Sequence, residues 1–131
     1  MTIFAAAHPL LAEALGKRGF ATMTDVQSAV LADSCNNKDL LVSAQTGSGK
    51  TVAFGLSMAA QLLGPDAEND FPSQPAALII TPTRELAMQV AESFKAYSEG
   101  HPNINILAVY GGSDFRSQLY SLKKGVEIIV G

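Results

Sequence analysis

The sequence predicts an α/β fold in which a parallel sheet is flanked by helices. Short apolar segments alternate with longer amphipathic ones along most of the 131 residues, which is the pattern of strands joined by helical crossovers. The apolar segments contain few polar residues, as expected for strands that are covered on both faces. A Gly-rich loop connects the first of these segments to the following helix, where a parallel α/β fold places such a loop.

The expected elements follow one another closely along the chain. Strands are expected over residues 39–44, 76–81, 104–110 and 126–130. Helices are expected between them, over residues 50–63, 84–99 and 113–124, and two short helices are expected before residue 34. Residues 64–75, which are rich in proline and acidic side chains, are expected to form a surface loop. The last strand reaches the final residue, so the domain is expected to be incomplete at its C-terminus.

The composition bears on the compartment and on the ligands. Hydrophobic residues make up 47% of the chain, enough to fill the core of one domain. The formal net charge is −3, so overall charge gives no indication of nucleic-acid binding, although a local site could hold a few phosphates. Cys35 is the only cysteine, which is consistent with a reducing compartment. The N-terminus does not resemble a signal peptide, and no apolar run approaches the ~20 residues that cross a membrane. The sequence therefore predicts a cytoplasmic protein.

A phosphate-binding loop is indicated between the first strand and its helix. It comprises Ala44, Gln45, Thr46, Gly47, Ser48, Gly49, Lys50 and Thr51. Glycines let backbone N–H groups turn toward a phosphate, and the start of the helix adds further N–H groups and a positive dipole end. Lys50 is placed to reach the β- and γ-phosphates of a nucleotide, and Thr51 to bind Mg²⁺ through its hydroxyl. These two residues are therefore the candidates for a catalytic role.

The alternative is a Gly-rich turn that only starts a helix, with Lys50 in solvent. A cation in the first turn of a helix is unfavourable by roughly 0.3–1 kcal/mol, and a bound phosphate removes that cost. Ala44 stands where the general phosphate-loop pattern has Gly. The loop by itself leaves kinases, GTPases, ATPases and helicases open.

Three further segments narrow this choice. Gly19-Phe20 is followed by Thr24 and Gln27, Pro82-Thr83-Arg84-Glu85-Leu86 follows the second strand, and Gly111-Gly112 follows the third. Together with the Ala form of the phosphate loop, and in this order, these segments resemble the DEAD-box RNA helicases over nearly the whole chain, from Phe4 to Gly112. They resemble that family's adenine-recognition element (Q motif), its first RNA-contact motif and its double-glycine element. Met23 departs from the resemblance, since the family usually has Pro there, and the Asp-Glu-Ala-Asp and Ser-Ala-Thr motifs do not occur in the sequence.

The resemblance implies a RecA-like P-loop domain that binds ATP with Mg²⁺ and contacts the RNA backbone with little sequence specificity. In the intact protein, a second RecA-like domain would close around both ligands, and ATP would drive local unwinding of RNA duplexes. Residues 1–34 would be the N-terminal helical adenine-recognition segment of the domain, and residues 35–131 would be the first part of helicase domain 1.

The isolated chain is expected to have no useful ATPase activity. Positioning the metal and the attacking water requires acidic residues that the resemblance places in motifs this sequence lacks. In a steady-state assay with RNA, the chain should therefore turn over ATP more slowly than ordinary enzymes, whose turnover numbers are about 1 s⁻¹ or more. Turnover at that level would contradict the expectation.

Each residue carried over for adenine also has a structural alternative. Gln27 is implied to pair with adenine through its amide, which offers both a donor and an acceptor. Thr24-x-x-Gln27 is also a capping box, in which Gln27 would accept from the Thr24 backbone N–H. Phe20 is implied to stack on the adenine ring, or else packs in the core.

The residues implied to bind RNA are Pro82, Thr83, Arg84, Gly111 and Gly112. Thr83 could instead be only a helix N-cap, and Arg84 could form a salt bridge with a neighbouring acid. Gly111 and Gly112 could form only a tight exit from the strand, or could allow close approach of the RNA backbone.

Two other classes of function remain open from the sequence. A small-molecule P-loop kinase would need a second pocket with basic lid residues, and no such run is found. A binding module without enzyme activity is the other possibility, including self-association through an exposed sheet edge.

Overall fold

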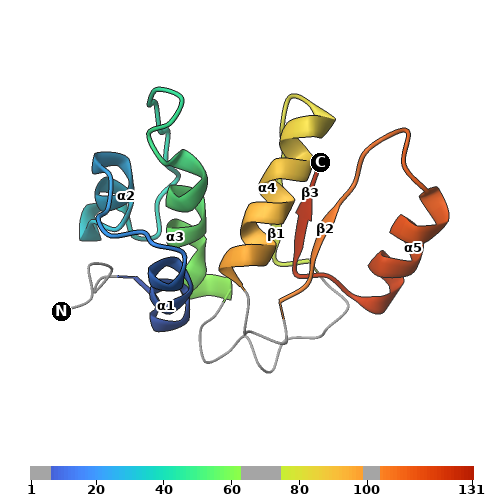
Figure 1. Cartoon of the computed structure of the whole chain (residues 1–131), viewed down its shortest axis with the longest axis horizontal. Coiled ribbons are helices and arrows are strands. Elements are labelled where there is room, and N and C mark those ends of the chain that lie inside the picture. Colours follow the sequence, from blue (N-terminus) through green and yellow to red (C-terminus); the bar gives the residue numbers. More distant parts are fainter. Residues whose placement is uncertain (1–6, 63–74, 99–103) are drawn as a thin grey trace. The chain divides into compact units, whose positions relative to one another are not determined.

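The chain divides into two units, Met1–Gly64 and Pro65–Gly131, which are described separately (Figure 1). The computed structural model describes residues 7–62, 75–98 and 104–131. Phe4 and most of the predicted loop at 64–75 lie outside the described residues. Among the described residues, every helix is too short or too polar to span a bilayer.

The first unit is helical. Its elements are α1 (Pro9–Lys17), α2 (Asp25–Val30), the short 3₁₀ helix η1 (Asp33–Cys35) and α3 (Lys50–Leu62). Pro9 occupies the first turn of α1, where a missing N–H costs nothing, and Lys17 lies in the last turn, where the helix dipole favours a cation. Helix α2 packs against α3. The buried apolar side chains of this unit are Leu11, Ala14, Leu15, Val30, Val52, Ala53, Leu56 and Ala59.

The predicted strand at residues 39–44 is wrong. These residues have no assigned secondary structure, Leu40 is 41% exposed and Leu41 is fully exposed. A strand needs a hydrogen-bonded neighbour, and no strand occurs in the described part of Met1–Gly64 that could serve as one. Strand pairing depends on residues distant in sequence, which the apolar pattern of this segment does not reveal.

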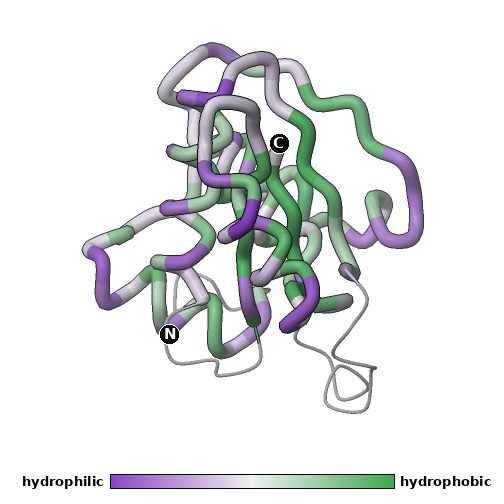
Figure 2. Tube along the Cα trace, turned by 90° about the vertical axis from the view of Figure 1, so that its right-hand side faces the viewer, coloured by the Kyte–Doolittle hydropathy of each residue, from purple (hydrophilic) through white to green (hydrophobic). Residues whose placement is uncertain are grey.

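The second unit contains the parallel sheet. Its elements are β1 (Ala77–Ile79), α4 (Arg84–Tyr97), β2 (Ile106–Ala108), α5 (Phe115–Lys124) and β3 (Ile128–Val130). The strands lie in the order β1-β3-β2, with Leu78, Ile129 and Leu107 in register. The predicted strands are therefore confirmed in place and in direction, although each is shorter than expected. The hydrophobic residues of Figure 2 are concentrated along these strands.

Helix α4 covers one face of the sheet. Its buried side chains are Ala87, Val90, Ala91 and Phe94, and the helix packs against β2 and β3. Ile106, Ile128 and Val130 are buried on the sheet. Side chains that point to the other face of the sheet are more exposed. Leu78 is 66% exposed, and Ile80, just after β1, is 80% exposed. In helix α5 no residue is buried.

Candidate nucleotide and RNA sites

The predicted phosphate loop forms a turn that leads into α3. The φ angles of Gly47 and Gly49 are 84° and 86°, a region that residues with a Cβ seldom adopt. The Ser48 N–H donates to the Gln45 carbonyl at 3.1 Å, and the Ala53 N–H donates to the Gly49 carbonyl at 3.1 Å. Gly49 therefore precedes the first turn of α3, so that the loop directs the N-terminus of this helix toward the space where a phosphate is expected.

Lys50 is held by the loop that it belongs to. Its Nζ donates a hydrogen bond to the Ala44 carbonyl, six residues earlier. The solvated Lys50 of the structural alternative is therefore not what is observed, since the side chain is half-buried and bonded. An ammonium group has three N–H donors, so Lys50 can bond a phosphate while one donor stays on this carbonyl.

Gln27 is 1% exposed and joins two parts of the first unit. Its Oε1 accepts from the Thr24 backbone N–H at 3.1 Å, and its own N–H donates to Thr24 Oγ1 at 3.4 Å. The capping-box alternative is therefore confirmed. In addition, Nε2 donates to the Gly49 carbonyl at 3.2 Å. The implied pairing with adenine stays a prediction, and it would use the second N–H and the second lone pair of the same amide.

Gly49 meets Gln27 so closely that no side chain could replace its hydrogen. A Cβ on residue 49 would lie 2.4 Å from Gln27 Nε2 and 3.2 Å from Thr24 Oγ1. Sequence reasoning missed this contact, which joins residues 22 positions apart. The start of α2 and the predicted phosphate loop are thus joined by a hydrogen bond.

A hollow of about 710 Å³ opens beside this junction. Its lining includes Thr24, Asp25 and Val26 at the start of α2, and Ala44, Gln45 and Ser48 in the loop. The Oγ atom of Ser48 is buried and has no hydrogen-bond partner in the described part of the chain. An unsatisfied buried hydroxyl costs free energy, and a phosphate oxygen in the hollow would satisfy it.

Phe20 and Thr51 are placed less definitely. Phe20 follows Gly19 at the end of α1, where its N–H donates to the Leu15 carbonyl at 3.2 Å, and it is half-buried. A half-buried Phe20 is compatible with stacking on adenine and with packing in the core. Thr51 is half-buried in the first turn of α3. The residues that the structure describes contain no cluster of three or more His, Cys, Asp or Glu for a metal.

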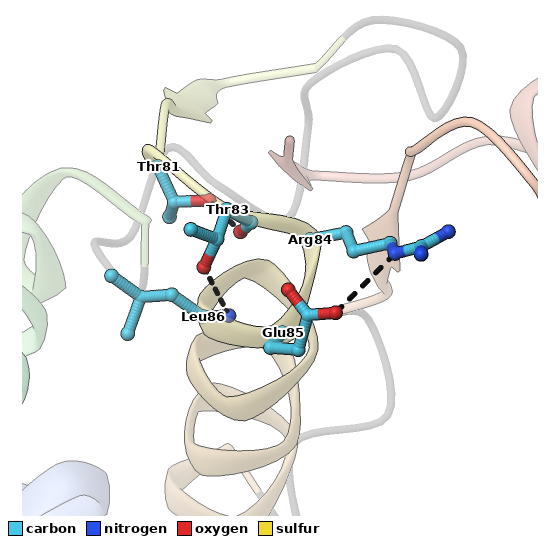
Figure 3. Close-up of polar contacts among 5 residues, drawn as sticks. All are labelled: Thr81, Thr83, Arg84, Glu85 and Leu86. Atoms are coloured by element: carbon cyan, nitrogen blue, oxygen red, sulfur yellow. Dashed lines mark hydrogen bonds and ion pairs between the residues drawn. The ribbon is translucent and has the colours of Figure 1, made fainter.

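The residues predicted to contact RNA lie where the strands end. The Thr81 N–H donates to the Gly131 carbonyl at 2.7 Å, which continues the sheet beyond β1 and β3. Thr81 Oγ1 donates to the Thr83 carbonyl at 2.9 Å, and Thr83 Oγ1 accepts from the Leu86 N–H at 3.2 Å (Figure 3). Thr83 is thus the N-cap of α4, as its structural alternative states.

Arg84 extends away from the axis of α4 toward the Glu85 carboxylate (Figure 3). Its Nε lies 3.3 Å from Glu85 Oε1, and both side chains are more than half exposed. The salt-bridge alternative is therefore confirmed, but exposed pairs of this kind are worth only about 0–1 kcal/mol and are readily exchanged. Pro82 is exposed beside them, and so are Gly111 and Gly112 between β2 and α5.

The order of these segments also matches a known family over most of the chain. The sequence pattern of the DEAD/DEAH box helicases matches residues 24–131. This chain belongs to the DEAD/DEAH box helicase family. The matched range contains the phosphate loop, Gln27 and every residue predicted to contact RNA.

Individual relatives of this DEAD-box chain agree with the family match. ATP-dependent RNA helicase DeaD of Mycobacterium tuberculosis is 38% identical over 125 residues, which are 95% of this chain and 21% of the relative. ATP-dependent RNA helicase RhlB of Serratia proteamaculans is 42% identical over 127 residues, which are 96% of this chain and 29% of the relative. The DEAD-box chain therefore spans less than a third of the length of these relatives.

Solved structures show the same fold. The RNA helicase Prp28 of Chaetomium thermophilum, bound to ADP, superposes with a TM-score of 0.81 at 28% identity, over 95% of this chain and 30% of that one. A DEAD box protein of Methanococcus jannaschii superposes with a TM-score of 0.77 at 33% identity, over 95% of this chain and 32% of that one. The predicted RecA-like α/β fold of the DEAD-box chain is confirmed.

Proposed function

We propose that this chain is the ATP- and RNA-binding portion of a DEAD-box RNA helicase that separates short RNA duplexes. The contact between Gln27 Nε2 and the Gly49 carbonyl carries the proposal, because it joins the adenine element to the phosphate loop. Binding of nucleotide phosphates by P-loop enzymes in general requires only the phosphate loop. A loop connected to a buried amide that has a free donor and acceptor position suits an adenine nucleotide in particular.

The residues of the first unit are suited to ATP. The N-terminus of α3, the N–H groups of residues 46–49 and the unsatisfied Ser48 hydroxyl favour phosphate oxygens. Lys50 is proposed to bind the β- and γ-phosphates, and Thr51 to be a ligand of Mg²⁺ that arrives with the nucleotide. Bound Mg²⁺ would neutralise charge that develops on the transferred phosphoryl group. Gln27 and Phe20 are proposed to hold the adenine.

RNA is proposed to bind at the carboxyl end of the sheet in the second unit. Thr83 and Pro82 hold the start of α4, Arg84 supplies a cation, and Gly111 and Gly112 leave the backbone exposed. Contacts of this kind reach phosphate and sugar, so little sequence specificity is expected.

Several broader features of the proposal depend on the family alone. The proposed domain organisation, with residues 1–34 as the adenine segment and residues 35–131 continuing helicase domain 1, stays a prediction. So do the second RecA-like domain of the intact protein and a cytoplasmic location. Self-association through an exposed sheet edge also stays a prediction.

The nucleotide part of the proposal is tested by isothermal titration calorimetry of the unsubstituted chain with ADP and with GDP. ADP is expected to bind weakly, with a Kd above about 1 µM, because residues 39–44, which lead into the loop, form no strand that would brace it. GDP is expected to bind at least about tenfold more weakly, since guanine presents the opposite donor and acceptor at the Gln27 amide. Equal affinity for the two nucleotides would contradict the proposal, and so would no binding of either to a folded chain.

A further inference from the structure

Gly112 and Arg84 approach each other across the second unit. A Cβ on residue 112 would lie 2.9 Å from Arg84 Nη1, a distance that real Cβ atoms essentially never show. The φ angle of Gly112 is 81°. Gly111 behaves differently, because a Cβ there would meet nothing within 4 Å. The two adjacent glycines are therefore not equivalent.

The guanidinium of Arg84 is bounded on two sides. Its Nη1 lies against the backbone of Gly112, and its Nε lies 3.3 Å from Glu85 Oε1. The start of α4, from which Arg84 projects, is fixed by the Thr83 cap and by the Thr81 hydroxyl. A guanidinium offers five N–H donors in a rigid plane, so the ion pair at Nε does not use the N–H groups of its two amino groups.

We infer that Gly112 is a positioning residue for Arg84: its missing side chain creates the space in which the guanidinium is held ready for an RNA phosphate. The inference rests on the proposed RNA function and deepens it. At position 112 the double-glycine element then acts on RNA through Arg84, and only position 111 is available for direct approach of the RNA backbone. Preorganisation of this kind lowers the entropy that binding must offset, because a free arginine samples many rotamers.

The chemistry predicts how a methyl group at position 112 would act. The crowded atom is the far end of a flexible side chain, so the guanidinium can swing away and the fold need not rearrange. The positive φ angle adds a local backbone cost. Gly112→Ala is therefore expected to displace Arg84 and to lower the stability slightly, whereas Gly16→Ala, where a Cβ would meet nothing within 4 Å, serves as the control for RNA affinity.

The test measures binding of a fluorescein-labelled oligouridine to the full chain by anisotropy. Arg84→Ala is expected to weaken binding about tenfold, as for the loss of a hydrogen bond from a charged group. Gly112→Ala is expected to weaken it about fivefold, and Gly16→Ala, at a glycine of α1 outside the proposed RNA site, by less than about twofold. The slope of log K against log salt should become about 0.7 less steep in Arg84→Ala, and it should fall in the same direction in Gly112→Ala, because a phosphate contact is lost.

A double-mutant cycle separates positioning from a direct or purely structural role. If Gly112 acts through Arg84, adding Gly112→Ala to Arg84→Ala should change the affinity by less than about twofold. A structural role would instead weaken binding in both backgrounds and leave the salt slope unchanged. Circular dichroism of each variant verifies that the chain remains folded.

The arginine itself gives a readout that does not need RNA. In a ¹H–¹⁵N spectrum of the free chain, Gly112→Ala should shift the Arg84 Nε–H resonance, and Gly111→Ala should leave it in place. An unmoved resonance, or additive losses in the cycle, would overturn the inference alone. If Arg84→Ala binds oligouridine as tightly as the unsubstituted chain, or if that chain does not bind it, the proposed RNA function is wrong, and the inference falls with it.

Discussion

Replacing Gln27 with alanine is expected to lower the free energy of unfolding by about 2–3 kcal/mol, through loss of the two side-chain hydrogen bonds of its buried amide, one of which completes the capping box of α2. The same substitution is expected to remove the preference for ADP over GDP. Gln27 is 1% exposed, and its amide bonds the Thr24 N–H and the Gly49 carbonyl. Urea unfolding followed by circular dichroism measures the first effect, and calorimetry measures the second.

Two further variants make this prediction specific. Gln89→Ala removes the same side chain from an exposed position of α4, so its effect on stability should stay within about 0.5 kcal/mol. Gln27→Glu keeps an oxygen that accepts from the Thr24 N–H, but an ionised carboxylate has no N–H to donate to the Gly49 carbonyl. It should therefore retain the cap and still lose the adenine preference. A Gln27→Ala chain as stable as Gln89→Ala would show that the buried amide stabilises nothing.

Replacing Lys50 with alanine is expected to weaken ADP binding strongly and to change the stability little. ADP affinity should fall by roughly 10- to 100-fold, because a charged hydrogen bond to phosphate is worth about 1.5–3 kcal/mol. The free energy of unfolding should change by less than about 1 kcal/mol, since the lost bond to the Ala44 carbonyl is offset by removal of a cation from the first turn of α3. Calorimetry and urea unfolding of the same preparation measure both quantities.

The control for Lys50 is Lys38, an exposed lysine of the same unit. Lys38→Ala removes an equal charge without touching the loop, so it should leave ADP affinity within about twofold. If the two variants weaken ADP binding equally, the effect is one of general charge, and the assignment of Lys50 to the phosphates is wrong.

The sequence predicts those features of the two sites that depend on residues close together in the chain. The Gly-Ser-Gly-Lys-Thr run specified both the loop and the start of α3, because glycine conformations and helix starts are set within a few residues. The caps at Thr24 and Thr83 were equally visible, each bonding a residue three positions ahead.

Contacts between residues far apart in the chain could not be predicted from the sequence. Residues 39–44 have the composition of a strand, yet pairing is decided by what lies beside them, and Leu41 is fully exposed. The contact between Gln27 and Gly49 joins residues 22 positions apart, and the space at Gly112 is occupied by an arginine 28 positions earlier in the chain. No local pattern signals either contact. The first contact adds a structural role for Gln27, and the second adds a positioning role for Gly112.

In the free chain, one N–H of the Lys50 ammonium group is engaged by the Ala44 carbonyl. The ammonium group has two further N–H donors, so this bond leaves it able to bind a phosphate. Holding a long side chain in one place before binding removes part of the rotamer entropy that binding would otherwise cost. The loop therefore keeps its own cation in place before any ligand arrives.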